Sequence, residues 1–199
     1  MTLTPSIDMG IDRDTFLRSV TIVVDTREQK NAHVIEELNK LGIMVEHRKL
    51  DYCDYSFMAG GRDFTMSCVV ERKANVEELY TNVSEGWRDK RRNDESRIEK
   101  ELEAAFTLSR SCTLIVENVA GWKELEQYEV SALQMIQNPK RQVKAIGKHV
   151  YSSLKSWSSN NRYNFNVEFV PDKRLTAAKL LEIFYYYWRN YKELTKARR

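Results

Sequence analysis

The stretch Cys68-Val69-Val70-Glu71-Arg72-Lys73 is typical of a buried β-strand that ends in three charged residues. Side chains in a strand alternate between its two faces, so Glu71 and Lys73 point to one side and Arg72 to the other. A carboxylate and an amine that emerge together from a buried strand must either pair or share a ligand. The shared ligand that suits both groups is a divalent cation with a bound water.

Two further strands are predicted before this one, and each leads to acidic residues. Residues 21–24 are β-branched and lead to Asp25, and Glu28 follows in the turn. Residues 43–50 are predicted to form the next strand, and Asp54 follows it. Asp54 precedes Glu71 by 71 − 54 = 17 residues, the separation of a hairpin. Adjacent strands can therefore bring these two carboxylates together.

The acids and the lysine together indicate a hydrolytic centre. Two neighbouring carboxylates, here Asp54 and Glu71, repel each other unless a cation neutralises them. Mg²⁺ accepts oxygen ligands from one or two carboxylates and keeps several waters. Lys73 could orient or deprotonate one of those waters and offset charge on a phosphorus centre. Asp25 and Glu28 could add a ligand, directly or through water. These parts predict metal-assisted hydrolysis of a phosphodiester.

The alternation of predicted elements indicates an α/β fold with a mixed central sheet flanked by helices. Residues 1–20 are predicted to be a tail or lead-in helix, and residues 21–199 one domain with its motifs in residues 21–118. Ligands in such folds gather at the carboxyl ends of strands, where Asp25 and Glu117 stand. Helices are predicted over residues 32–41, 76–83, 96–108, 122–137, 140–157 and 175–194, and further strands over residues 113–117 and 165–170.

Composition excludes several classes of protein. The 199 residues carry 32 Lys and Arg against 29 Asp and Glu, a net charge of +3 that is too small to indicate nucleic acid alone. No stretch approaches the roughly 18–20 apolar residues of a membrane span. Cys53, Cys68 and Cys112 are far apart and suggest neither a disulfide framework nor a zinc site. The first ten residues lack a secretory signal, which predicts a cytoplasmic protein.

Two local features suggest partners. Residues 86–93 form the most basic window and include an aromatic side chain, a combination suited to phosphate contacts and base stacking, although a solvated surface is the alternative. The residues concerned are Trp87, Arg88, Lys90, Arg91 and Arg92. Residues 184–191 hold six aromatic side chains on several faces of the last helix. Either a second copy of the chain or the helix's own core could bury them, so a homodimer through this helix stays open.

Three motifs in this order resemble a known family. The motifs are similar to those of the nuclease domain of the XPF family, and especially to those of its stand-alone members in bacteria and phages. They are Val24-Asp25-Thr26-Arg27-Glu28, residues 50–55 and residues 70–73. That family belongs to the PD-(D/E)xK, restriction-endonuclease-like superfamily. The resemblance implies an endonuclease that uses Mg²⁺ or Mn²⁺ to cut one strand near junctions of duplex and single-stranded DNA, in repair or recombination, in the cytoplasm of a bacterial or phage-infected cell.

The resemblance also implies roles for individual residues. The metal ligands would be Asp25, Asp54, Glu71 and the backbone carbonyl of Arg72, with Glu28 as a supporting acid and Lys73 as the catalytic lysine. Arg27 and Arg72 would hold acids or phosphates, and Arg97, in the helix that follows, would join the DNA contacts. The family has a glycine where this sequence has Cys53, a difference that an extended backbone would tolerate.

Three alternatives stand beside this interpretation. Glu71 and Lys73 could be a structural ion pair at a strand end. The chain could be a DNA-binding subunit with an inactive catalytic site, a class that the family contains. It could also be a nuclease similar to Holliday-junction resolvases, which cleavage products on junction and flap substrates would distinguish.

Overall fold

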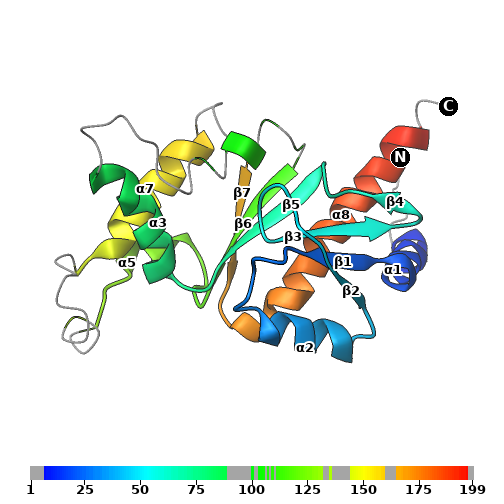
Figure 1. The fold of residues 1–199 in the computed structure, drawn as a ribbon, viewed down its shortest axis with the longest axis horizontal. Helices are drawn as coiled ribbons and strands as arrows, with labels where there is room; N and C mark the ends of the chain where they lie inside the picture. The colour runs from blue at the N-terminus through cyan, green and yellow to red at the C-terminus, as the bar shows by residue number, and fades with distance from the viewer. Residues whose placement is uncertain are drawn as a thin grey trace. The chain divides into compact units, whose positions relative to one another are not determined.

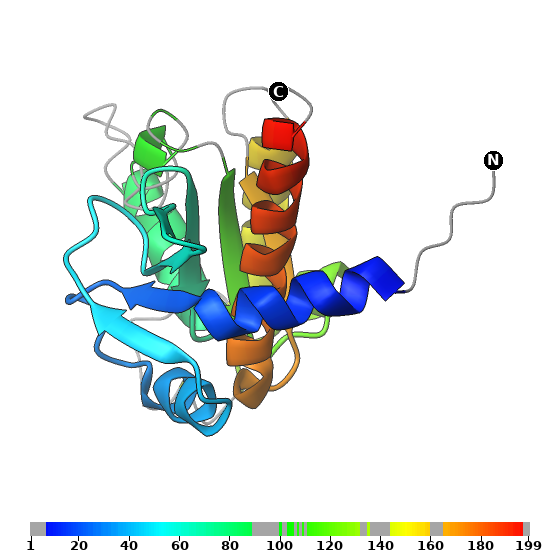
Figure 2. The same ribbon diagram turned by 90° about the vertical axis from the view of Figure 1, so that its right-hand side faces the viewer.

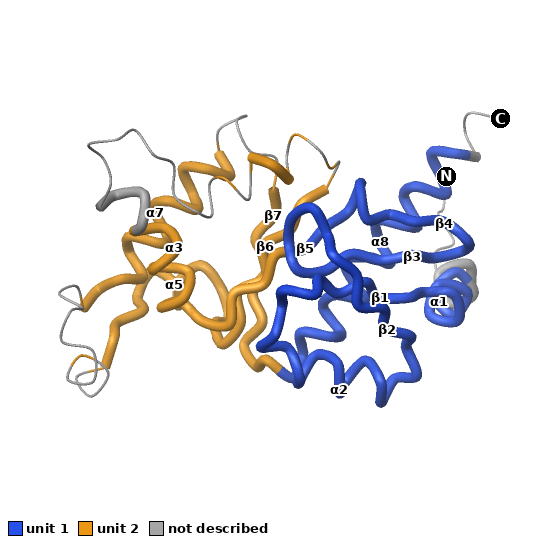
Figure 3. The backbone as a smooth tube through the Cα atoms, in the orientation of Figure 1, with its two compact units in different colours: residues 1–70, 174–199 blue, residues 71–173 orange. Residues whose placement is uncertain are grey.

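The computed structural model describes residues 7–88, 111–131, 144–159 and 165–196, with short helical positions between residues 100 and 109 and at residue 135. These residues form two compact units, one from residues 1–70 and 174–199 and the other from residues 71–173 (Figure 3). The boundary between Val70 and Glu71 falls inside the strand that carries the central motif.

The first unit is built on a mixed sheet, as the sequence predicts. Its strands are β1 (Thr21–Val24), β2 (Met44–His47), β3 (Tyr55–Ala59), β4 (Arg62–Asp63) and the first half of β5 (Cys68–Lys73). The order is β2-β1-β3-β5, and β4 pairs with β3 (Figure 1). β1 and β2 are parallel, whereas β3 runs antiparallel to β1 and β5. β2 is shorter than the predicted strand over residues 43–50.

Three helices complete the first unit: α1 (Ile7–Ser19), α2 (Ala32–Lys40) and α8 (Thr176–Lys196). A 3-10 turn, Lys173–Leu175, leads into α8. α2 ends near the predicted position because Gly42 adopts φ 70°, and its backbone N–H returns to the carbonyl of Asn39. α8 packs against α1, α2 and β3, and Figure 2 shows α1 crossing beside it.

An aromatic cluster forms the core of the first unit. Phe16 of α1 is fully buried, and its ring centre lies 6.0 Å from that of Phe57, 5.7 Å from Tyr185 and 5.5 Å from Trp188. The segment predicted as a tail or lead-in helix is thus a helix that contributes to the core. The aromatic residues of α8 largely pack inside their own unit, but Tyr186 is 51% exposed. A homodimer through this helix stays a prediction.

The second unit contains the last half of β5, β6 (Ser111–Glu117) and β7 (Phe165–Val170), in the order β5-β6-β7. β6 and β7 are parallel. Its described helices include α3 (Val76–Arg88), α5 (Trp122–Gln127) and α7 (Ile146–Ser159). None of the helices in the described part of the chain is long and apolar enough to cross a membrane.

The helices of the second unit begin and end differently from the prediction. α5 stops at Gln127, although the sequence predicted a helix up to residue 137. α7 starts at Ile146 rather than at residue 140, because the backbone N–H of Gly147 donates to the carbonyl of Tyr128 at 3.1 Å. A Cβ on Gly147 would lie 2.0 Å from the carbonyl oxygen of Leu125, so only glycine permits this crossing. Residues 140–143 lie outside the described part of the chain.

Candidate active site

Asp25 organises the site residues of the first unit. β1 ends at Val24, and the buried Asp25 carboxylate accepts four hydrogen bonds. Its Oδ1 accepts from the backbone N–H and the Nε of Arg27, both at 2.7 Å. Its Oδ2 accepts from the backbone N–H of Leu50 at 2.6 Å and from Nη2 of Arg27 at 3.0 Å. These four bonds match the roughly four lone-pair positions of a carboxylate.

The network connects two loops and fixes the charge of Asp25. Nη2 of Arg27 also donates to the Leu50 carbonyl at 2.8 Å, so the turn after β1 is fastened to the loop after β2. Burial alone would raise the pKa of Asp25, but the hydrogen bonds from Arg27 and Leu50 outweigh it and hold the pKa below its ordinary value of 3.8. Arg27 therefore holds an acid. A metal bound by Asp25 would have to replace one of these donors.

Asp54 stands between the other two motifs through its backbone. Its N–H donates to the carbonyl of Val70 at 3.0 Å, and its carbonyl accepts from the N–H of Asp25 at 2.8 Å. Its side chain is half-buried. The preceding Cys53 adopts φ 61°, in the left-handed region, so the extended backbone that would tolerate a side chain at this position is not the one present. The turn into Asp54 needs the conformation that a glycine adopts most readily.

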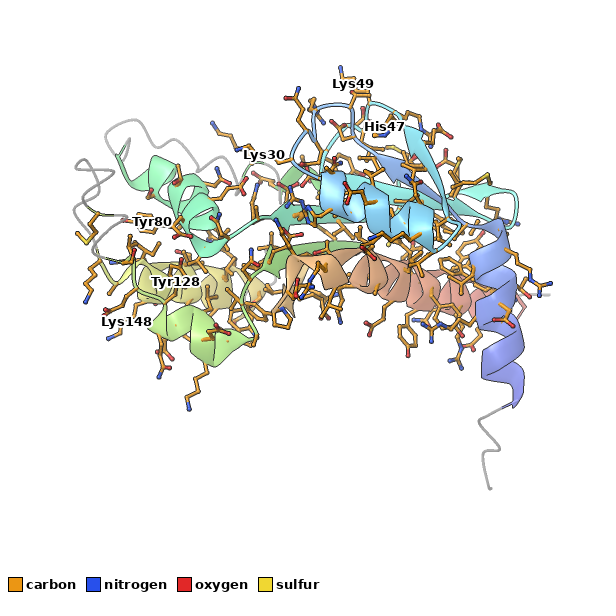
Figure 4. The ribbon with its side chains drawn as sticks, turned by 90° about the horizontal axis from the view of Figure 1, so that it is seen from below. Lys30, His47, Lys49, Tyr80, Tyr128 and Lys148 are labelled. Atoms are coloured by element: carbon orange, nitrogen blue, oxygen red, sulfur yellow. The ribbon has the colours of Figure 1, made fainter. Side chains whose placement is uncertain are left out.

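Glu28 and several basic residues lie on or beside the loops after β1 and β2. Glu28 is half-buried, and its Oε1 accepts from the backbone N–H of Lys30 at 2.8 Å. Lys30 and Lys49 are exposed side chains on these loops, and the exposed His47 is the last residue of β2 (Figure 4). Sequence reasoning did not single out these three, because they are scattered along the chain among other basic residues.

Glu71 and Lys73 form a buried ion pair in the second unit. Lys73 Nζ lies 2.6 Å from Glu71 Oε1, and both side chains are less than a tenth exposed. The alternation predicted for the strand explains why these two meet while Arg72, between them, points elsewhere.

Arg72 pairs with the acid at the end of the next strand. Its Nη1 donates to Oε2 of Glu117 at 2.9 Å, and this pair is also buried, with 3% and 1% of the side chains exposed. Arg72 thus holds an acid, one of the two roles that the resemblance allowed. A contact between its guanidinium and DNA would require this pair to open.

Most of the predicted basic window, residues 86–93, lies outside the described part of the chain. Trp87 and Arg88 belong to the end of α3, but their side chains lie outside the described residues, as do Lys90, Arg91, Arg92 and Arg97 altogether. Within the described residues, no group of three or more His, Cys, Asp or Glu side chains is placed to hold a metal ion. The expected acids are shared between the two units: Asp25 and Asp54 in the first, Glu71 in the second.

Comparison with known families agrees with this arrangement of motifs. Residues 24–183 match the family model of the ERCC4 domain, which covers most of the chain and all three motifs. The chain belongs to the ERCC4 domain family. No curated protein matches the sequence.

Two solved structures have the same fold as this ERCC4 domain. XPF from Aeropyrum pernix is 18% identical, with a TM-score of 0.53 over 82% of this chain and 64% of that one. XPF from Aeropyrum pernix in complex with DNA is 16% identical, with a TM-score of 0.54 over 85% of this chain and 66% of that one. The chain thus spans less than two thirds of their length. The resemblance to the XPF family and the restriction-endonuclease-like fold are confirmed.

Proposed function

We propose that this ERCC4 domain is a Mg²⁺- or Mn²⁺-dependent endonuclease that hydrolyses phosphodiester bonds in DNA. One observation carries the proposal: the backbone of Asp54 joins all three motifs. Its N–H bonds to Val70, the residue before Glu71, and its carbonyl bonds to Asp25. Backbone bonds of this kind tie the first two motifs to the residue that opens the third, which supports the proposal that the three motifs act together.

Asp54 and Glu71 are the carboxylates that would hold the metal, with the Arg72 carbonyl as a third ligand. Tyr55 pairs with Val70 in the antiparallel ladder, so along the chain Asp54 directly precedes one member of this pair and Glu71 directly follows the other. Carboxylate and carbonyl oxygens are the ligands that Mg²⁺ and Mn²⁺ prefer. When bound, the ion supplies an activated water and polarises the phosphate.

The other residues position groups and stabilise charge. The Lys73 ammonium, held 2.6 Å from Glu71, would orient the attacking water by donating a hydrogen bond or would stabilise charge on the phosphate oxygens. Both carboxylate oxygens of Asp25 accept hydrogen bonds from Arg27 and Leu50, so we assign Asp25 a positioning role beside the metal. Glu28 remains a supporting acid.

DNA is the proposed substrate, and junctions between duplex and single-stranded DNA are the proposed sites of cleavage. The XPF structure solved with DNA supports a nucleic-acid partner, and the exposed Lys30 and Lys49 supply cations for phosphates. Selectivity for flaps, forks or junctions and a cytoplasmic role in repair or recombination are parts of the same proposal. So is a homodimer through α8, for which Tyr186 offers an exposed contact.

The test compares two variants that remove the same charge from one loop. Wild type, Asp54→Asn and Asp51→Asn are incubated with labelled flap, splayed-arm, four-way and duplex DNA, in Mg²⁺, Mn²⁺ or chelator. Asp51 is exposed, whereas Asp54 makes the backbone bonds described above. We expect the wild type to cut DNA only when the metal is present. Asp54→Asn is expected to lower this cleavage by at least about 100-fold, whereas Asp51→Asn retains it. Both variants are expected to bind DNA as the wild type does.

Other outcomes would identify the alternatives. DNA binding by the wild type without cleavage under any metal would favour the inactive DNA-binding subunit. Paired cuts confined to the four-way substrate would favour a nuclease similar to Holliday-junction resolvases. Unchanged cutting by Asp54→Asn would remove Asp54 from the metal site.

A further inference from the structure

The residue that follows Lys73 is held from two sides within the second unit. The N–H of Ala74 donates to Oε2 of Glu78 at 3.0 Å, and the carbonyl of Ala74 accepts from Nδ2 of Asn118 at 2.9 Å. Glu78 is itself anchored in the first turn of α3, because its N–H donates to Oδ1 of Asn75 at 2.8 Å. The two successive peptide groups that Ala74 joins are therefore each held by a side chain.

Asn118 reaches Ala74 because of its unusual backbone. It directly follows β6 and adopts φ 61°, a conformation that asparagine tolerates better than most residues. The chain resumes its pairing at once, since the N–H of Val119 donates to the carbonyl of Val170. Asn118 is thus a single left-handed residue at the end of a strand, and its amide connects that end to the residue after β5.

The residue before Lys73 is held by the same strand end. Arg72 is paired with Glu117 at 2.9 Å in a buried site, and Glu117 immediately precedes Asn118. The last residue of β6, Glu117, and the residue after it, Asn118, therefore hold the two neighbours of Lys73, one through its side chain and one through its backbone carbonyl. Lys73 itself is directed to Glu71.

We propose that Asn118 is a positioning residue that, with Glu117, holds the residues on either side of Lys73 and thereby sets the position of its amine. The inference rests on the proposed nuclease function, in which Lys73 acts on the attacking water or the phosphate. Misplacement of a catalytic group by an ångström lowers rates by up to about 100-fold, so a single hydrogen bond from the Asn118 amide to the Ala74 carbonyl is enough to matter.

The experiment separates the hydrogen bond from the backbone conformation. Asn118→Gly and Asn118→Asp both tolerate a positive φ, but neither can donate to the Ala74 carbonyl. Asn166→Ala, at an exposed position of β7, is the matched control. With flap DNA and Mg²⁺, we expect kcat to fall by at least about ten-fold in both Asn118 variants with KM little changed, and to stay at the wild-type value in the control.

A second readout does not depend on cleavage. In the full chain labelled with ¹⁵N on lysine Nζ, the signal of Lys73, assigned through Lys73→Ala, is expected to shift in Asn118→Gly and to stay in place in Asn166→Ala. Wild-type kcat and an unmoved Lys73 signal in Asn118→Gly would overturn the positioning role. If wild type cuts no DNA, the proposed function fails, and the Lys73 signal alone decides whether Asn118 positions Lys73.

Discussion

Lys73 and Glu71 meet at 2.6 Å in a site that is almost closed to water. Each charge is tolerated there partly because the other is present, since an isolated buried charge is costly. The pair therefore serves stability as well as the proposed chemistry, and the two contributions can be separated by measuring folding without DNA.

A double-mutant cycle on this pair tests their mutual dependence. Lys73→Met leaves the Glu71 carboxylate buried without its ammonium, and we expect the free energy of unfolding to fall by about 3–5 kcal/mol. Adding Glu71→Gln removes the stranded charge, so the double variant is expected to be more stable than Lys73→Met alone. Urea denaturation at pH 7 provides the values. Strictly additive effects would show that the two side chains do not depend on each other.

Asp25 predicts a specific acid sensitivity. Its pKa in the folded protein lies below 3.8, so its carboxylate stabilises the fold fully above that pH and loses the effect as the pH falls through the lower folded value. Asp25→Asn is expected to cost about 1–3 kcal/mol at pH 7, and the difference from wild type is expected to shrink below about pH 4.

The control for this prediction is Asp51→Asn, which removes an equal charge from an exposed position of the loop after β2, the loop that Arg27 contacts at Leu50. Asp51→Asn should leave the free energy of unfolding, measured by urea denaturation, within about 0.5 kcal/mol of the wild-type value across the pH range. A gap between Asp25→Asn and wild type that stays constant down to pH 2 would contradict the role of the carboxylate charge.

Gly147 predicts a steric effect with a matched control. A Cβ there would lie 2.0 Å from Leu125 O and 2.8 Å from Tyr128 N, both backbone atoms, so Gly147→Ala must move α7 away from α5. We expect a loss of at least about 2 kcal/mol. Gly121 has an extended φ of 164° and no atom within 4 Å of its Cβ position, so Gly121→Ala should be nearly neutral. Equal thermal stability of the two variants would show that the crossing can adjust.

Cys53 predicts a cost of backbone strain next to Asp54. Cys53→Ala removes the thiol but keeps a Cβ at φ 61°, whereas Cys53→Gly removes both. We expect the glycine variant to be more stable than the alanine variant by about 1 kcal/mol in urea denaturation, because a Cβ is disfavoured in the left-handed region. The reverse order would mean that the turn into Asp54 is not strained.

Local patterns were sufficient to predict the strand that carries the central motif. Alternation along β5 placed Glu71 with Lys73 and separated Arg72, because side-chain direction in a strand depends only on sequence position. The helices α2 and α8 also follow from apolar periodicity and their terminal signals. The helix α1 was harder to predict, since Phe16 is the buried residue among its described side chains and one aromatic residue sets no period.

Contacts between distant residues could not be predicted in this way. The Leu50 N–H reaches Asp25 across 25 residues, and the Asn118 amide reaches Ala74 across 44. The positive φ of Cys53 is equally invisible, because tertiary hydrogen bonds on both sides of Asp54 impose it on a residue that would otherwise avoid it.

The first unit is assembled from both ends of the chain, since α8 packs on α1, α2 and β3. During synthesis the whole of residues 71–173 leaves the ribosome before α8 does. Tyr185 and Phe184 of α8, which pack against Phe16 and Phe57, are therefore synthesised after the rest of the first unit. The sheet whose strands adjoin Asp25 and Asp54 cannot pack against α8 until then. Nascent chains stalled before residue 176 would expose this apolar face and depend on chaperones, whereas most multidomain proteins complete their N-terminal part first.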